Sequence, residues 1–329
     1  MMRAVITGIT GFVGSYLAEY LLANTDWDIV GMCRWRSPLN NIQSLIPEIN
    51  KGGRVRLVYA DLRDGIAVRE AVEQAKPTHV FHLAAQSYPK TSFASPLDTL
   101  DVNIQGTVRL LDALKKFDAE IHVCSSSEVY GRAKSIPISE DAPFHPASPY
   151  AVSKVGCDLM ARHYAEAYGM RIQITRMFTH TSARRGDVFA ESSFAKQIAM
   201  IEADMIPPVV KVGNLKSLRT IADVRDAVRA YHMLLTVNPI PGEVYNIGGY
   251  HTCTVGGILN TLLAMSSSKI EVEVDPQRLR PVDADLQVPD CSKFMNHTGW
   301  KPEIPFEQTM RDLLSFWRDR VKTYPVLNR

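Results

Sequence analysis

The stretch Gly8-Ile9-Thr10-Gly11-Phe12-Val13-Gly14 decides the fold, because glycine recurs at every third position between two regular elements. The apolar run at residues 3–7 before it predicts a β-strand, and residues 15–23 after it carry leucines at helical spacing. In such a strand–loop–helix unit the glycines let the backbone approach a pyrophosphate, which the free N–H groups of the helix N-terminus then bind. The predicted contacts with a dinucleotide cofactor are Gly8, Thr10, Gly11, Phe12, Val13 and Gly14.

Short apolar runs alternate with helical patterns through the rest of the first half. The predicted strands after the first are residues 28–33, 55–59, 79–83 and 121–124. A long helix is predicted over residues 102–116. This alternation indicates βαβ units and therefore an α/β fold, a Rossmann-type doubly wound parallel sheet with helices on both faces. A smaller α/β C-terminal domain is expected to bind the substrate.

The second half of the chain is less regular, and pairs of prolines and glycines mark its loops. Residues 224–235 predict a further helix, and residues 243–247 predict a strand that returns to the main sheet. The two expected domains are therefore interleaved. They are a cofactor-binding domain, 1–176 with return segments at about 215–249, and a substrate-binding domain, 177–214 with 250–329.

The end of the second predicted strand favours NADP over NAD. An NAD-binding fold usually places a carboxylate here for the ribose 2′-hydroxyl, whereas this chain has Arg34, Arg36 and Ser37. Guanidinium groups present a planar fork of donors that suits a 2′-phosphate. A solvated basic turn is the alternative interpretation.

Further cofactor contacts are predicted after the third and fourth strands, because ligands of an open α/β sheet bind at the carboxyl ends of its strands. Asp61 and Leu62 follow the third strand and are expected beside the adenine. After the fourth strand the expected contacts are Leu83, Ala84, Ala85 and Ser87.

Tyr150 and Lys154 lie four positions apart, so a helix would place them on one face. A lysine ammonium favours the phenolate, which can take a proton from a sugar hydroxyl as hydride leaves the carbon. Ser126 follows a predicted strand and can hydrogen-bond the same hydroxyl. Glu128 adds a carboxylate that a simple dehydrogenase does not need, and we expect it to be a general base for the carbon next to a ketone. The alternatives are a structural tyrosine–lysine pair and a surface glutamate.

The composition excludes several classes of protein. The 46% of hydrophobic and 22% of charged residues are typical of a globular chain. The net charge is +2 and the basic residues are scattered, so no nucleic acid partner is expected. The five cysteines are well separated and lack CxxC spacing, which predicts neither a disulfide framework nor a metal site and favours the cytoplasm. No apolar stretch reaches the roughly 18 residues of a membrane helix, so no membrane partner is expected.

Taken together, these residues resemble the extended short-chain dehydrogenase/reductase family, and within it the GDP-mannose 4,6-dehydratases. The resemblance runs over nearly the whole chain. Residues 34–41 fall where those enzymes have an arginine–serine loop that touches NADP and reaches a neighbouring subunit. A segment similar to the family's His-Glu-Ser-Pro-Arg-Arg-Gly implies cofactor contacts from His180 and Arg185. The implied contacts with a GDP-linked sugar are Ser87, Ser127, Thr179, Asn214, Arg219, Arg280 and Asp283.

The resemblance also implies a reaction. Tyr150, helped by Lys154 and Ser126, would take the C4 hydroxyl proton of the hexose while hydride passes from C4 to NADP⁺. Glu128 would then remove the C5 proton, water would leave from C6, and the same hydride would return to C6. NADP is then regenerated in each turnover and no metal is required. The family resemblance further implies a homodimer or homotetramer.

The chain departs from the family pattern at several positions that would hold the cofactor, the sugar or the nucleotide. Phe12-Val13 replace Gln-Asp, Ser126 and Thr179 replace a threonine and an asparagine, and Asp283 replaces a glutamate. The substrate therefore stays open between GDP-mannose and another GDP-sugar such as a heptose. The related GDP-4-keto-6-deoxymannose reductase, which consumes NADPH and has less need of Glu128, is a second alternative. A non-catalytic NADP-binding protein is a remote third, since fold does not fix function.

Overall fold

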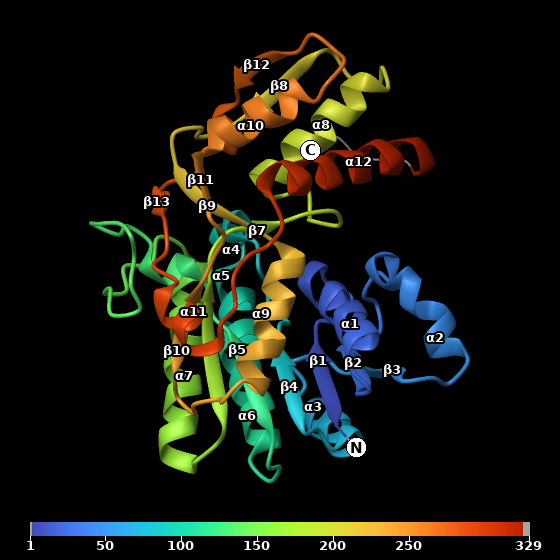
Figure 1. Ribbon diagram of the computed structural model, residues 1–329, viewed down its shortest axis with the longest axis vertical. Helices are drawn as coiled ribbons and strands as arrows, with labels where there is room; N and C mark the ends of the chain where they lie inside the picture. Colours follow the sequence, from blue (N-terminus) through green and yellow to red (C-terminus); the bar gives the residue numbers. More distant parts are fainter. Residues whose placement is uncertain (1, 325–329) are drawn as a thin grey trace.

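A parallel sheet of seven strands forms the centre of the larger part of the molecule (Figure 1). The computed structural model describes residues 2–324. The sheet has the strand order β10-β6-β5-β4-β1-β2-β3, so the chain reverses its direction of travel between β1 and β4. Ligands of doubly wound folds bind at this point. The strands are β1 (Arg3–Thr7), β2 (Asp28–Cys33), β3 (Val55–Tyr59), β4 (His79–His82), β5 (Glu120–Cys124), β6 (Ile172–Met177) and β10 (Val244–Ile247).

Helices cover both faces of this sheet, which confirms the predicted fold class. Ala4 and Ile6 of β1 belong to one buried core, whereas Val5 between them belongs to the other. The first face is covered by α1 (Phe12–Asn24) and α9 (Val224–Thr236). The opposite face is covered by α3 (Gly65–Ala75), α6 (Gly106–Leu114) and α7 (Pro149–Tyr168). Alternate residues of a buried strand thus pack on opposite helix layers.

Shorter helices fill the connections of the larger part. They are η1 (Asn40–Leu45) and α2 (Ile46–Asn50) after β2, and α4 (Pro89–Ala94), α5 (Pro96–Leu100) and η2 (Asp101–Gln105) after β4.

The helix predicted over residues 102–116 begins as a π turn, η2, which follows α5 directly, and it continues as α6 to Leu114. Asn103 lies in this turn, where its side chain accepts the Gln86 N–H at 2.8 Å and donates to Ser153 at 2.8 Å. The turn therefore joins the loop after β4 to α7.

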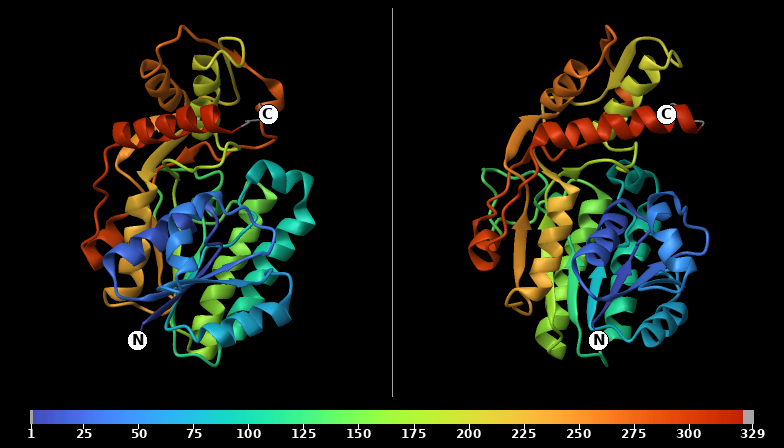
Figure 2. Two further views of the ribbon diagram at one scale, coloured as in Figure 1. Left: turned by 90° about the vertical axis from the view of Figure 1, so that its right-hand side faces the viewer. Right: turned by 45° about the vertical axis from the view of Figure 1, so that its right-hand side comes forward.

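The smaller part lies beyond the carboxyl ends of the large sheet (Figures 1 and 2). Its core is built from the apolar faces of three helices packed on short strands. The helices are α8 (Ala190–Glu202), α10 (Val255–Ala264) and α12 (Phe306–Thr323). The strands are β7 (His180–Thr181), β8 (Val209–Val212), β9 (Leu218–Asp223), β11 (His251–Thr254), β12 (Glu271–Val274) and β13 (Leu286–Gln287).

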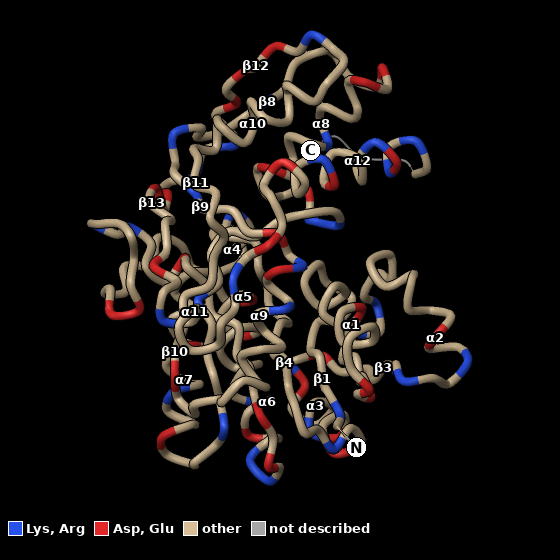
Figure 3. Tube along the Cα trace, in the orientation of Figure 1, with Lys and Arg blue, Asp and Glu red and all other residues tan. Residues whose placement is uncertain are grey.

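The two parts exchange segments, as the interleaved pattern predicts, and the domain boundaries stay a prediction. The segment expected to return at 215–249 divides at Asp223: β9 pairs within the small sheet, while β10 pairs with β6 of the large one. Further on, α11 (Ser292–Thr298) packs against the large sheet, because Phe294 and Trp300 are buried in its first core. Within residues 2–324, no helix combines the length and apolarity that crossing a bilayer demands. Basic and acidic residues are interspersed along the whole trace (Figure 3).

Candidate active site

The glycine loop leaves the N-terminus of α1 open. Gly8 has a φ of +74°, a conformation that L side chains rarely adopt. A Cβ added at Gly14 would lie 2.3 Å from the Gly8 carbonyl oxygen, so only glycine lets the first turn of α1 pack on the loop. Gly11 is the N-cap and offers no side-chain acceptor, which leaves the first N–H groups of the helix for an anion. This cradle fits the pyrophosphate of a dinucleotide.

A cavity of about 530 Å³ lies at the carboxyl ends of β2 and β3. Its lining includes Arg34 and Arg36, as the sequence predicts, and also Arg63. Arg63 donates to the two carboxylate oxygens of Asp61 at 3.1 and 2.7 Å, and these bonds lower the pKa of that carboxyl. Ser37 closes a turn by donating its N–H to the Arg34 carbonyl at 3.0 Å. Since Arg63 already balances Asp61, the other two guanidinium groups give the cavity the charge that suits a phosphate ester.

The loop after β4 runs close to the glycine loop. The Thr7 hydroxyl accepts the N–H groups of Leu83 and Ala84, each at 3.1 Å, and so fixes the backbone where it leaves the sheet. A Cβ at Gly8 would come within 3.0 Å of the Ala84 Cα. Ala85 and Ser87 continue this loop at half-buried positions. The predicted cofactor contacts from β1 and β4 therefore lie at one edge.

Tyr150 and Lys154 lie in the first turns of α7 and are both buried, with 8% and 6% of their surface exposed. Lys154 Nζ donates to the Cys124 carbonyl at 2.7 Å, which ties α7 to the end of β5. The Ser126 side chain lies beside the Tyr150 phenol and lowers its pKa. Burial raises the pKa of this phenol and outweighs the lowering by Lys154 and Ser126, so at neutral pH the tyrosine holds its proton. Lys154 thus acts in the expected direction, but without producing a phenolate in this state.

Glu128 shares this region with the tyrosine. It lies in a short helical turn, η3 (Ser127–Tyr130), and the Ser126 hydroxyl caps the turn by accepting the Glu128 N–H at 3.2 Å. The Glu128 carboxylate interacts electrostatically with Tyr150 and also with Arg219 of β9. Burial lowers the pKa of the Arg219 guanidinium, and Glu128 opposes that shift. The fold therefore brings a phenol, a carboxylate and a guanidinium together from three separate elements.

Arg219 also faces the other residues expected to hold a nucleotide. It interacts electrostatically with Arg280 and Asp283, and Arg280 Nε lies 3.8 Å from an Asp283 oxygen. Asn214 Nδ2 donates to Asp283 at 3.1 Å and to Ser217 at 3.0 Å. The structure thus gathers Asn214, Arg219, Arg280 and Asp283 in one cluster, in which two guanidinium groups suit a diphosphate.

Three of the residues predicted to contact the cofactor or the sugar also make contacts that support the fold. The Leu62 side chain is buried, and a Cβ added at Gly106 would lie 2.8 Å from the Leu62 Cβ. Ser127 is buried in η3, with 5% of its surface exposed. Thr179 follows β6, and its carbonyl accepts the Ala222 N–H at 2.9 Å. The side chains of Leu62 and Ser127 therefore contribute to the core whatever else they bind.

An aromatic stack joins the glycine loop to the segment that contains His180 and Arg185. The His180 ring stacks on Phe12 with centroids 6.0 Å apart and planes 12° apart. The Arg185 guanidinium lies 5.3 Å from the Phe12 centroid and 3.4 Å from that of Phe189, and its Nε donates to Glu191 at 3.3 Å. Burial lowers the pKa of His180 to about 3, so this ring is neutral. Phe12, where the family has a glutamine, thus packs both predicted cofactor residues.

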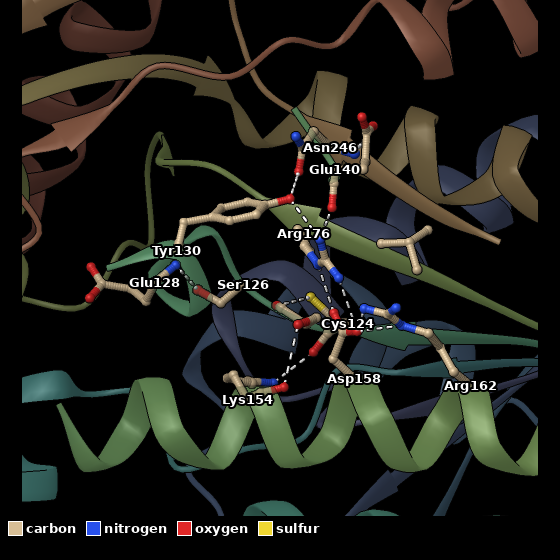
Figure 4. A network of polar contacts seen from close by, with 12 residues as sticks. Cys124, Ser126, Glu128, Tyr130, Glu140, Lys154, Asp158, Arg162, Arg176 and Asn246 are labelled. Atoms are coloured by element: carbon tan, nitrogen blue, oxygen red, sulfur yellow. Dashed lines mark hydrogen bonds and ion pairs between the residues drawn. The ribbon is translucent and has the colours of Figure 1, made fainter. Parts of the chain in front are cut away.

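Sequence reasoning missed several residues that adjoin the site. The place of Arg63 in the site could not be predicted, because it depends on the cavity wall formed after β2 and β3. Tyr130, Asp158 and Arg176 form a buried network behind Glu128 and Lys154 (Figure 4). One signal was available: Asp158 continues the four-residue spacing of the Tyr–Lys pair on α7. Among residues 2–324, no cluster of three or more histidine, cysteine, aspartate or glutamate side chains is placed to hold a metal.

Comparison with known proteins agrees with this geometry. The family model described as GDP-mannose 4,6 dehydratase matches residues 5–313. A GDP-mannose 4,6 dehydratase of Drosophila melanogaster is 32% identical, and the match covers 98% of this chain and 88% of that protein. A GDP-6-deoxy-D-mannose reductase of Pseudomonas aeruginosa is 30% identical, with 97% and 98% covered.

A solved structure, RMD from Pseudomonas aeruginosa complexed with NADPH, has the same fold. Its TM-score is 0.82 at 29% identity, and the match covers 97% of this chain and 99% of that one. Other neighbours, including a dTDP-glucose 4,6-dehydratase from Bacillus anthracis with a TM-score of 0.83 at 23% identity, share the fold alone. The family match and the curated relatives extend over almost all of the sequence, and the chain therefore belongs to the GDP-mannose 4,6-dehydratase family.

Proposed function

We propose that this chain dehydrates GDP-mannose to GDP-4-keto-6-deoxymannose with tightly bound NADP. The observation that carries the proposal is that the Glu128 carboxylate of η3 lies near enough to Tyr150 of α7 and Arg219 of β9 to interact electrostatically with both. A reaction that only moves hydride needs the tyrosine but not the carboxylate. A dehydration needs both, because a proton must leave the carbon next to the new ketone.

The residues present fit NADP as the cofactor. The glycine cradle at the N-terminus of α1 accepts a pyrophosphate, and Arg34 and Arg36 supply charge for a 2′-phosphate. The Phe12 side chain of the glycine loop stacks on the His180 ring. When bound, NADP supplies the acceptor for the C4 hydride and the donor that returns it to C6.

The chain's own residues would handle the protons. Tyr150 first loses its proton to solvent, and the buried Lys154 ammonium stabilises the phenolate that results. The phenolate then takes the proton of the C4 hydroxyl. Ser126, which lies beside the phenol, orients the hydroxyl and then the carbonyl. Glu128 removes the C5 proton that the ketone has acidified. Glu128 or Tyr150, now protonated, gives a proton to the departing C6 hydroxyl. The second proton returns to C5 when hydride reaches C6, so both side chains end the turnover as they began it.

Binding of the nucleotide would fall to the cluster on the smaller part. Arg219 and Arg280 donate to the diphosphate, while Asn214 and Asp283 hold the loops that carry them. Arg219 then spans the diphosphate and the Glu128 carboxylate. Ser87, Ser127 and Thr179 are proposed to contact the sugar.

A second candidate is reduction of a GDP-4-keto-6-deoxy sugar by NADPH. The similarity to the Pseudomonas aeruginosa reductase, which covers 98% of that protein, favours it. Such an enzyme would use Ser126, Tyr150 and Lys154 in the same way and would leave Glu128 idle.

Mass spectrometry of GDP-mannose incubated with the protein and catalytic NADP⁺ separates the two candidates. Dehydration predicts a product lighter by one water, with no net NADPH. Unchanged GDP-mannose, together with stoichiometric NADPH oxidation on the 4-keto-6-deoxy sugar, would replace the proposal with the reductase. If both sugars remain unchanged, other GDP-sugars such as a heptose are the next substrates to test.

Assembly and location complete the proposal. We propose a homodimer or homotetramer, which light scattering of the purified protein would test. The cytoplasm is the proposed location, supported by five cysteines that are all free.

A further inference from the structure

An arginine buried behind the proposed catalytic groups forms the centre of a polar network (Figure 4). Arg176 lies on β6 with 2% of its side chain exposed. It donates from Nε and Nη2 to the two oxygens of Asp158, at 2.8 and 3.2 Å. Asp158 is fully buried and also accepts from Arg162. Buried ion pairs add little net stability, since desolvation offsets their attraction, so stability alone gives no reason to bury this one.

A second set of bonds leads from Arg176 to Tyr130. Arg176 Nη1 donates to the Tyr130 hydroxyl oxygen at 2.8 Å, and that hydroxyl donates to Asn246 Oδ1 at 2.7 Å. Burial raises the pKa of Tyr130 to about 12, so the phenol keeps the proton that it donates. The same Nη1 also reaches the Glu140 carbonyl at 2.7 Å. Every contact here is a directional bond between groups with little freedom to move.

The two ends of the network lie on the two elements that carry the proposed chemistry. Asp158 comes one turn after Lys154 and two turns after Tyr150 on the same face of α7. Tyr130 is the last residue of η3, which contains Glu128. The bonds Asp158–Arg176–Tyr130 therefore join the helix of the phenol to the turn of the carboxylate.

We propose that Arg176 is a positioning residue that sets the place of the Glu128 turn relative to α7 through Asp158 and Tyr130. The kinetic part of this proposal rests on the proposed dehydration. A separate hydrogen bond, from Lys154 Nζ to the Cys124 carbonyl, joins α7 to the end of β5. Without the Arg176 link, the last residue of η3 would keep its packing and its bond to Asn246 but lose its connection to α7.

Tyr130→Phe is the sharpest variant, because it keeps the buried ring and removes only the hydroxyl, which links Arg176 to η3 and also donates to Asn246. Replacing Arg176 itself would leave the buried Asp158 without its main partner and endanger folding. Tyr245→Phe is the matched control. It removes another buried tyrosine hydroxyl from the large sheet, one that bonds His297 away from the site.

The first measurement needs no substrate. Amide hydrogen exchange is followed in the peptide covering η3, where Val129 and Gly131 donate to Ser126 and Glu128 at 3.2 and 3.1 Å. The proposal predicts exchange about 10-fold faster in Tyr130→Phe than in wild type or Tyr245→Phe, because the turn opens more often. Equal exchange in all three proteins would overturn the proposal whatever the enzyme's substrate is.

The second measurement uses GDP-mannose. Tyr130→Phe is expected to lower kcat about 10- to 100-fold with KM within 2-fold of wild type, since misplacing a group costs rate rather than binding. NADPH should accumulate in the variant, because C5 deprotonation slows while C4 oxidation continues. A kcat equal to that of Tyr245→Phe would contradict the positioning role. Inactive wild-type protein would instead refute the proposed function, and the exchange result would then decide the inference alone.

Discussion

Replacing the two arginines at the end of β2 should abolish the preference for NADP over NAD that we propose for this protein. Arg34 and Arg36 line the cavity of about 530 Å³, in which Arg63 is already paired with Asp61 at 2.7 Å. These two guanidinium groups are therefore the ones left to bind a 2′-phosphate. NAD lacks that phosphate and should not sense their loss.

The size of the effect follows from the exposure of both side chains. A charge-assisted hydrogen bond contributes roughly 1.5–3 kcal/mol, and exposed positions such as Arg34 and Arg36 justify the lower end of that range. Each alanine variant should then weaken NADP⁺ binding about 10-fold, and the double variant about 100-fold. The Kd for NAD⁺ should change by less than 2-fold.

Isothermal titration of protein stripped of its cofactor measures both constants. Arg69→Ala, which removes an exposed arginine from α3, is the matched control, since Arg69 does not line the cavity. Raising the salt concentration should weaken NADP⁺ binding in wild type more than in the double variant. A double variant that binds NADP⁺ with the wild-type Kd, or whose Kd for NAD⁺ rises as much as its Kd for NADP⁺, would contradict this prediction.

Three further predictions follow from the site and the core. Glu128→Gln should lower turnover by roughly 10²- to 10⁴-fold while cofactor binding persists; unchanged turnover would remove its role as base. Gly14→Ala should abolish NADP⁺ binding, because the added Cβ would meet backbone at 2.3 Å, whereas Gly65→Ala, with 3.7 Å of room, should bind normally. Burial lowers the pKa of both His82 and His122 to about 3, so each histidine takes up a proton more readily in the unfolded chain. The free energy of unfolding should therefore decrease as the pH drops below 6.5, by about 1 kcal/mol per histidine between pH 7.5 and 5.5. Urea unfolding that gives the same free energy at both pH values would contradict this.

The large sheet could be predicted closely from the sequence. The strands expected at residues 28–33 and 55–59 coincide with β2 and β3, and the return strand expected at 243–247 is β10, paired with β6. Strands buried on both faces leave continuous apolar runs, and the glycine loop places the first of them. Local pattern and tertiary packing agree at these positions.

Other features depend on contacts between distant parts of the chain, which the local sequence does not specify. Arg176 and Asp158 pair through a bond between β6 and α7, and the spacing of Asp158 from Tyr150 and Lys154 does not reveal that partner. The π turn at Asp101–Gln105 contains Asn103, whose hydrogen-bond partners lie in other elements. The second ion pair of Arg63, with Asp98 at 3.2 Å, likewise joins segments that are far apart in the sequence.

The raised pKa of Tyr150 shows a similar limit. The spacing of Tyr150 and Lys154 predicts an attractive charge, which the structure contains. Burial acts on the same phenol in the opposite direction and has the larger effect. Spacing reveals neighbours along a helix, whereas desolvation depends on everything that packs around it.

Following deuterium from C4 of GDP-mannose tests the central claim most directly. The reaction is run with GDP-[4-²H]mannose in ordinary water, and the product is analysed by NMR and mass spectrometry. The proposed mechanism predicts a product that has lost one water and carries the deuterium at C6, because the hydride taken from C4 is the one returned. Product without deuterium at C6, or recovery of unchanged substrate, would contradict the account.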